Sequence, residues 1–222
     1  RLEKIIVIPL FPQYASASTG SVNSKVMEII KTWQVIPEIR YFVSFYDHPL
    51  FIKAFVEIGK KHLEENAFDH IVFSYHGLPE RQIKKADQSK SCLTEDGCCA
   101  KIGHQNRHCY RAQCFETSRL LAKALRIKDE DYTVCFQSRL GKSPWIKPYT
   151  DEIVRQLPAK GKKKVLVFAP SFVADCLETI IEIGVEYRIL FENSGGEKWQ
   201  MVESLNTHPL WVETLKELVI DY

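Results

Sequence analysis

Short apolar runs alternate with longer segments of helical period along this chain, and this alternation limits its fold more than any other feature. Apolar runs of four or five residues between turn residues are typical of buried strands, and apolar positions three or four apart are typical of helices. The expected strands are residues 4–8, 40–43, 70–74, 132–136 and 164–168, and the expected helices are residues 22–33, 49–64, 115–124, 145–157 and 210–218. Such alternation is typical of parallel sheets with crossover helices. The sequence therefore predicts an α/β fold.

Length and charge narrow the class of protein further. At roughly 150 residues per domain, 222 residues correspond to one large domain or two small ones. Lys and Arg number 30 and Asp and Glu number 28, so no field that would gather nucleic acid is expected. No apolar run approaches the roughly 18 residues of a membrane-spanning helix, and the chain does not begin with the regions of a signal peptide. We therefore expect a cytoplasmic protein without a nucleic-acid partner.

His76 is the first candidate functional residue. It follows the expected strand at residues 70–74 and precedes Gly77, in the position beyond a strand's carboxyl end where open α/β sheets bind ligands. An imidazole with an ordinary pKa of about 6.5 can accept and release protons near neutrality. A hydrogen-bonded structural histidine is the alternative, and the residue alone does not decide between them.

A row of acidic residues follows the expected strand at residues 164–168. Glu178, Glu182 and Glu186 are spaced by four, which places three carboxylates on one face of a helix, and Asp175 precedes them by almost one turn. They could relay protons or guide a cation into a site. A solvated helix face explains the same spacing, so both interpretations stay open.

Cysteine is the unusual part of the composition. Five of the seven cysteines lie within 23 residues of a polar segment, residues 80–114, which has no clear period and reads as an insert; they are Cys92, Cys98, Cys99, Cys109 and Cys114. A disulfide framework is not expected in a reducing compartment. Metal binding is the better interpretation, either as a zinc site completed by His104 or His108 or as an iron–sulfur cluster. Five cysteines are candidates for four ligand positions, so one of them is spare. The spacing does not decide whether Cys98 or Cys99 is the ligand.

Five short motifs occur in a particular order along the chain. They are residues 10–14 (LFPQY), 74–79 (SYHGLP), 136–139 (FQSR) followed by Pro144-Trp145, 175–179 (DCLET) and 203–206 (ESLN). In sequence and interval they resemble the ferrochelatases, enzymes that insert Fe(II) into a porphyrin. Cys176 departs from the pattern, because several relatives have a histidine there.

The resemblance implies two Rossmann-like halves, each with a parallel sheet, and a porphyrin cleft between them. Residues 1–65 would be the remainder of the N-terminal half and the crossover, and residues 66–222 the C-terminal half with the metal-binding insert at residues 80–114. Because the chain begins with Arg1 and enters a strand almost at once, we expect the first half to be truncated and the natural start to lie upstream.

The resemblance also assigns roles to residues at matching positions. His76 and Glu178 would be the catalytic pair that meets the substrate iron. The residues expected along the substrate or proton path are Tyr14, Gln137, Ser138, Asp175, Glu182 and Glu186. The implied activity is insertion of Fe(II) into protoporphyrin IX. Coproporphyrin or another tetrapyrrole is the alternative substrate, and a non-catalytic iron–sulfur or haem sensor is the alternative function.

Some bacterial ferrochelatases resemble this chain in carrying cysteines at the insert, where they hold a two-iron two-sulfur cluster. The resemblance therefore favours a 2Fe-2S cluster on four of the five insert cysteines over zinc. Because porphyrins are apolar and family members often associate with membranes, it also implies possible peripheral contact with the inner membrane. Cys135, by contrast, is expected to be a small buried residue of a strand.

Overall fold

The computed structural model describes residues 2–87, 90, 92–93 and 97–220 and contains two parallel sheets. The smaller sheet pairs β1 (Lys4–Val7) with β2 (Glu38–Tyr41). The larger sheet has the order β4-β3-β5-β6, and its strands are β3 (His70–His76), β4 (Tyr132–Gln137), β5 (Lys164–Phe168) and β6 (Lys198–Met201). Each pairing between these strands is parallel. The predicted α/β class with parallel sheets is confirmed.

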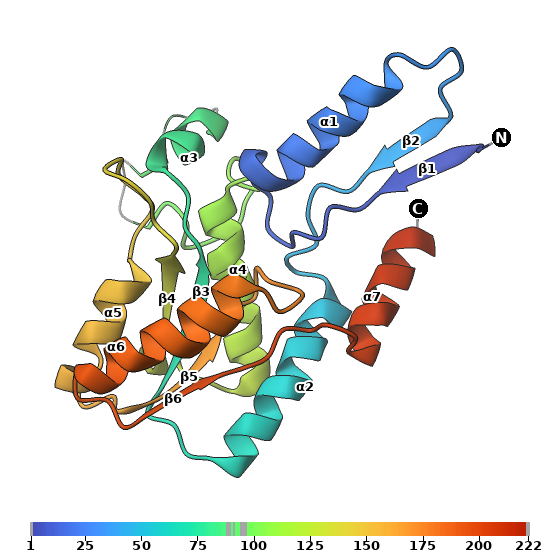
Figure 1. Ribbon diagram of the computed structural model, residues 1–222. Helices are drawn as coiled ribbons and strands as arrows, with labels where there is room; N and C mark the ends of the chain where they lie inside the picture. The colour runs from blue at the N-terminus through green and yellow to red at the C-terminus, as the bar shows by residue number, and fades with distance from the viewer. Residues whose placement is uncertain (1, 88–89, 91, 94–96, 221–222) are drawn as a thin grey trace.

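Helices cover both faces of the larger sheet (Figure 1). The α-helices are α1 (Ser21–Ile30), α2 (Pro49–Glu65), α3 (Glu80–Ala86), α4 (Tyr110–Leu125), α5 (Thr150–Gln156), α6 (Tyr187–Asn193) and α7 (Pro209–Ile220). Two segments are π-helical, η1 (Ser16–Gly20) and η4 (Glu178–Glu186). Core contacts place α2, α4 and α7 on one face of the sheet, and α5, η4 and α6 on the other.

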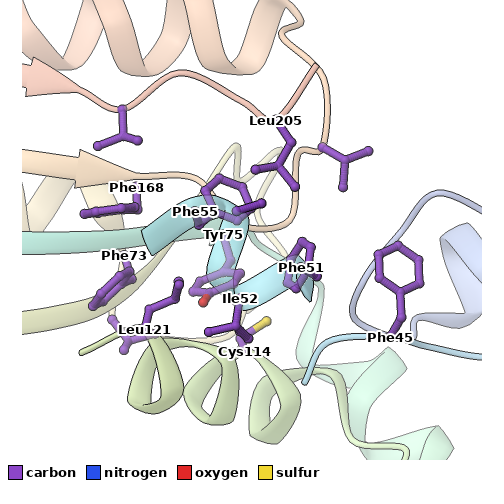
Figure 2. Close-up of a cluster of buried hydrophobic side chains, with 14 of the residues drawn as sticks. Phe45, Phe51, Ile52, Phe55, Phe73, Tyr75, Cys114, Leu121, Phe168 and Leu205 are labelled. Carbon is purple, nitrogen blue, oxygen red and sulfur yellow. The ribbon is translucent and has the colours of Figure 1, made fainter. Parts of the chain in front are cut away.

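Strand residues alternate between these two cores. Phe73 and Phe168 pack with α2 and α4, as Figure 2 shows, whereas Val72 and Val167 pack with α5 and α6. A strand buried on both faces needs apolar side chains at every position. This requirement explains why the strands were visible in the sequence as continuous apolar runs.

Several predicted boundaries were wrong. The helix expected at residues 145–157 begins only at Thr150, because Pro148 disfavours helical geometry at the residue before it. The segment at residues 80–114 is not irregular throughout, since α3 and the first turn of α4 lie in it. The strand β6 and the helix α6 were not predicted.

The chain order of the strands creates a topological switch point at the carboxyl ends of the strands of the larger sheet. From β3 the chain crosses to β4 on one side, and from β4 it returns to β5 on the other side of β3. Ligands of open α/β sheets bind at such a switch point, beyond the carboxyl ends of the strands. His76 ends β3 at this edge, and the segment from Ala169 onward follows β5 there. Among the described residues, no helix is both long and apolar enough to cross a membrane.

Candidate active site

His76 is fixed by its ring and by its main chain. Its Nδ1 lies 2.7 Å from the Gly77 carbonyl oxygen, which can only accept a hydrogen bond. In the neutral ring Nδ1 therefore carries the hydrogen and Nε2 is the basic nitrogen. The His76 carbonyl accepts a hydrogen bond from the Tyr110 hydroxyl at 2.8 Å, and its N–H meets Ser171 Oγ at 3.5 Å. Strand β3, helix α4 and the loop after β5 thus all hold this residue.

Glu178 is the first residue of η4, and its carboxylate lies within electrostatic range of His76. Its own main-chain N–H donates to its carboxylate, the Cys176 thiol lies within hydrogen-bond reach, and the nearby His76 ring attracts it; together these lower the pKa of Glu178. Burial, with Glu178 beside it, raises the pKa of Cys176. At neutral pH the site therefore holds an ionised carboxylate and a protonated thiol beside the His76 ring.

Glu182, one position of the acidic row further on, is tied to the end of β4. Its carboxylate accepts hydrogen bonds from Gln137 Nε2 at 3.0 Å, from the Ser138 main-chain N–H at 2.9 Å and from Ser138 Oγ at 2.5 Å. Tyr187 donates a fourth at 2.9 Å. Burial and the Glu182 charge raise the pKa of Tyr187, so its hydroxyl stays a donor. Ser138 adopts the left-handed region at φ 62°, which turns its N–H and hydroxyl toward the same carboxylate.

Gln137 connects the two glutamates, and a buried serine sets its orientation. Ser74 Oγ donates to Gln137 Oε1 at 2.7 Å, which points the Gln137 amide nitrogen toward η4. That nitrogen bonds Glu182 and lies 3.5 Å from the Glu178 carbonyl oxygen. The ends of β3 and β4 are also joined directly, since the Gly77 N–H donates to the Gln137 carbonyl at 2.8 Å. A Cβ at Gly77 would stand 2.8 Å from that oxygen, so only glycine fits.

The remaining acidic candidates lie outside this constellation. Asp175 accepts hydrogen bonds from the Ser204 N–H and from Asn206 Nδ2. Burial alone would raise the pKa of Asp175, but these bonds outweigh it and lower the pKa. Glu186 is exposed at the end of η4. The structure therefore brings together His76, Glu178, Gln137, Ser138 and Glu182, and not Asp175 or Glu186.

The acidic row lies on a π-helix rather than on the expected α-helix. A π-helix is rare, has i→i+5 hydrogen bonds and occurs frequently at functional sites. It spans Glu178–Glu186 and includes Gly184. The three carboxylates have different environments: Glu178 interacts electrostatically with His76, Glu182 is hydrogen-bonded to the end of β4, and Glu186 is exposed.

A cavity of about 890 Å³ adjoins the start of α4 and is lined by thiols. Four cysteines line it, Cys92, Cys98, Cys99 and Cys109, and Tyr14, His104 and His108 line it as well. The sulfurs of Cys98 and Cys99 are 3.6 Å apart. Burial, with the neighbouring thiols, raises the pKa of Cys92 to about 11, and a hydrogen bond with Cys109 is the main cause that raises the pKa of Cys99. The chemistry of this donor set fits a soft metal, although no three His, Cys, Asp or Glu residues of the described part are already arranged to hold an ion.

Cys114 does not belong to this group. It is fully buried on α4 and packs in the apolar core, where Figure 2 shows it among the apolar side chains. The sequence left Cys98 and Cys99 as alternatives for the spare cysteine. The structure places both at the cavity and Cys114 outside it. Cys135 is fully buried in β4, as predicted.

Several residues of the site were not predicted from sequence. Ser74, Tyr110 and Tyr187 each donate a hydrogen bond that fixes a candidate residue. Of these three, only Ser74 lies in one of the five motifs, residues 74–79, and His76 was the more conspicuous candidate in that motif. Contacts that join residues 34 or 63 positions apart leave no local pattern in a sequence.

The fold and the site define an α/β protein with an open sheet, which carries an imidazole and carboxylates at the carboxyl ends of its strands. These groups have the chemistry to bind a ligand that exchanges protons or a cation. A family model described as Ferrochelatase matches residues 1–222. The chain is 45% identical over 215 residues to a ferrochelatase of Legionella pneumophila (strain Lens). The aligned region covers 97% of this chain and 63% of that protein. It is 41% identical over 215 residues to a ferrochelatase of Coxiella burnetii (strain Dugway 5J108-111), with 97% and 60% covered. The chain belongs to the ferrochelatase family, and it spans about three-fifths of the length of these curated relatives.

Proposed function

We propose that the protein containing this chain inserts Fe(II) into protoporphyrin IX to form haem. The observation that carries the proposal is the pair of His76 and Glu178: an imidazole whose Nε2 is left free of the Gly77 carbonyl, and a carboxylate within its electrostatic range that its surroundings keep ionised. Exposed apolar side chains stand next to the pair in the chain. Leu177 and Ile180 flank Glu178, and Leu140 follows Ser138 closely. These apolar side chains could contact the apolar rim of a macrocycle while its centre contacts the polar groups of the pair.

The reaction exchanges one Fe(II) for the two N–H protons of the porphyrin, and no electron is transferred. His76 Nε2 accepts the two pyrrole protons one after the other and releases each to solvent, since Nδ1 is already bonded to the Gly77 carbonyl. Glu178 attracts the cation as its water is removed. Glu182 already accepts four hydrogen bonds from β4, the residue after it and Tyr187, so its role is to hold η4 against β4. Glu186 is exposed and can pass protons to solvent.

Two glutamates of η4 give a matched test. In an anaerobic assay of the full-length protein with Fe(II) and protoporphyrin, Glu178→Gln should abolish metallation. Glu186→Gln, which changes an exposed carboxylate of the same helix, should retain most of it. No metallation by the unmodified protein would refute the function, and equal rates for the two variants would refute the role of Glu178. The same assay with coproporphyrin decides between the two porphyrins, and haem binding without turnover would favour a sensor.

For the thiol cavity we propose a 2Fe-2S cluster held by Cys92, Cys98, Cys99 and Cys109. The support is that four thiols line one cavity, a number and chemistry that suit such a cluster. Bound there, the cluster would brace the segment before α4 or respond to redox state. Purified anaerobically, the protein should be brown, with visible charge-transfer bands that bleach on reduction. Cys92→Ser should lose the bands and Cys114→Ser should keep them. A colourless protein with one bound zinc would overturn the cluster.

We also propose that the protein is cytoplasmic with peripheral contact at the inner membrane. Phe11 and Leu10, at the loop after β1, are exposed apolar side chains that could meet lipid. Co-sedimentation of the full-length protein with anionic vesicles should fall when both are changed to Ser. Unchanged sedimentation of the double variant, or none for the unmodified protein, would contradict this contact.

A further inference from the structure

The thiol cavity and His76 are joined by the first turn of α4. Cys109 lines the cavity and is the residue immediately before α4, and Tyr110 is the first residue of the helix. The Tyr110 hydroxyl donates to the His76 carbonyl at 2.8 Å. The residue next to a cavity thiol therefore contacts the main chain of His76 directly.

A second contact runs from the same turn to Tyr14. Gln113 Oε1 accepts a hydrogen bond from the Tyr14 main-chain N–H at 2.6 Å, and Gln113 Nε2 donates to the Arg107 carbonyl at 2.6 Å. Arg107 and Tyr14 both line the cavity. The Tyr14 ring also meets His108 edge-on, with ring centroids 6.0 Å apart. The start of α4 is thus bonded to the cavity wall on one side and to His76 on the other.

Tyr110 is suited to carry this link because its side chain is buried and its hydroxyl has a single direction to donate, toward the His76 carbonyl. A buried ring has few alternative rotamers, so a displacement of the helix start moves the hydroxyl with it.

We propose that Tyr110 is a positioning residue that couples occupancy of the thiol cavity by a soft metal to the position of His76. Metal bound to Cys109 and its neighbours fixes the start of α4, and the Tyr110 hydroxyl transmits that placement to the carboxyl end of β3. The consequence for metallation rests on the function proposed above, whereas the coupling itself does not. Coupling of this kind is reciprocal in binding free energy, so it is measurable without turnover.

The test uses this chain, Cd²⁺ as the soft metal and histidine-selective ¹⁵N labelling. The chain has seven histidines, so the ring signals are few, and His76→Gln assigns that of His76. At constant pH, Cd²⁺ should shift the His76 signal in the unmodified chain. Tyr110→Phe should bind the same amount of Cd²⁺ and lose the shift. Tyr75→Phe is the matched control, because it removes a buried hydroxyl that bonds Ser118 and not His76.

Each outcome decides the proposal. Absence of Cd²⁺ binding, a His76 signal that does not move, or a full shift in Tyr110→Phe would overturn it. A shift that survives in Cys92→Ser with Cys109→Ser would show direct binding of Cd²⁺ at His76, and would overturn it too. If Tyr110→Phe does not fold, the unmodified chain and the double cysteine variant still decide. In the full-length protein, Tyr110→Phe should lower kcat for metallation by up to about 10²-fold with KM unchanged. If the unmodified protein did not metallate a porphyrin at all, that result would count only against the proposed function.

Discussion

Strand β3 carries a histidine at each end, and the two ends lie in opposite surroundings. His70, at the amino end, is buried, bonds Thr133 Oγ1 at 2.9 Å through Nε2, and has a buried Nδ1 without a hydrogen-bond partner among the described residues. His76, at the carboxyl end, is half-buried and held through Nδ1, with Nε2 as its basic nitrogen. Burial, together with the charge of Lys162, lowers the pKa of His70 to about 4.

The difference shows that position in a parallel sheet decides what a histidine can do. The amino edge surrounds His70 with the turns that connect the strands, so its ring is only a packed, neutral side chain. The carboxyl edge gathers His76, Gln137 and Ser138 around a crevice, with η4 across it. Residue type alone would treat the two histidines alike.

The largest expected effect separates these two histidines by activity. In the full-length protein, His76→Ala should lower porphyrin metallation by about 10²- to 10⁴-fold, the usual contribution of a positioned base. His70→Asn, measured at pH 7.5, should keep turnover close to that of the unmodified protein. Steady-state haem formation checks both. Unchanged turnover in His76→Ala would break the comparison and the assignment of the base.

The second effect concerns stability and belongs to His70. Its folded-state pKa of about 4 lies below the unfolded value of about 6.5. Above pH 6.5 both states are neutral and the residue adds no pH dependence. As pH falls from 6.5 to 4 the unfolded state binds a proton that the folded state does not, so stability falls, by about 2 kcal/mol at pH 5 and about 3 kcal/mol by pH 4.

Urea unfolding of the chain at pH 7 and pH 5 measures this loss. His70→Asn should reduce the difference between the two pH values by about 2 kcal/mol. His62→Asn is a control at a surface histidine, and it should leave most of the difference in place. An equal pH dependence in His70→Asn and the unmodified chain would show that the proton is taken up elsewhere.

The third prediction compares two carboxylates of η4 by stability instead of activity. Glu182→Gln places an amide where Gln137, Ser138 and Tyr187 all donate, and should destabilise the chain by about 2 kcal/mol. Glu186→Gln should change stability by less than about 0.5 kcal/mol, since its side chain is exposed. Thermal or urea unfolding checks the pair. Equal losses would mean that η4 is not anchored through Glu182.

Much of the sheet could be predicted from sequence because its strands are buried on both faces. Val165 to Phe168 is a continuous apolar run for that reason. The edge strand β6 pairs only with β5 and contains Lys198 and Gln200, so it gave no such run. The position of His76 followed from the strand before it, since a strand end is visible in sequence.

The rest of the site depends on contacts that span the fold. The spacing of the glutamates suggested an α-helix, but the segment is π-helical, and bonds from Gln137 and Ser138 are among those that hold it. Likewise, the spacing of the cysteines could not separate Cys98 from Cys99. The folded chain distinguishes Cys114 from the other four insert cysteines, because those four line the thiol cavity and Cys114 does not.

The smallest expected effect comes from removing one hydroxyl at the carboxyl end of the sheet and one at its amino end. Ser74→Ala removes the donor that orients Gln137, and Thr133→Val removes the partner of His70. Each should cost about 1 kcal/mol of stability, because each leaves one buried polar atom without its hydrogen bond. Only Ser74→Ala should also lower kcat for metallation, since only its partner Gln137 touches Glu182 and the Glu178 carbonyl. If Ser74→Ala and Thr133→Val lost the same activity at equal stability, the two ends of the sheet would not differ in function through these hydroxyls. If neither variant lost activity, the orientation of Gln137 would be irrelevant to the reaction.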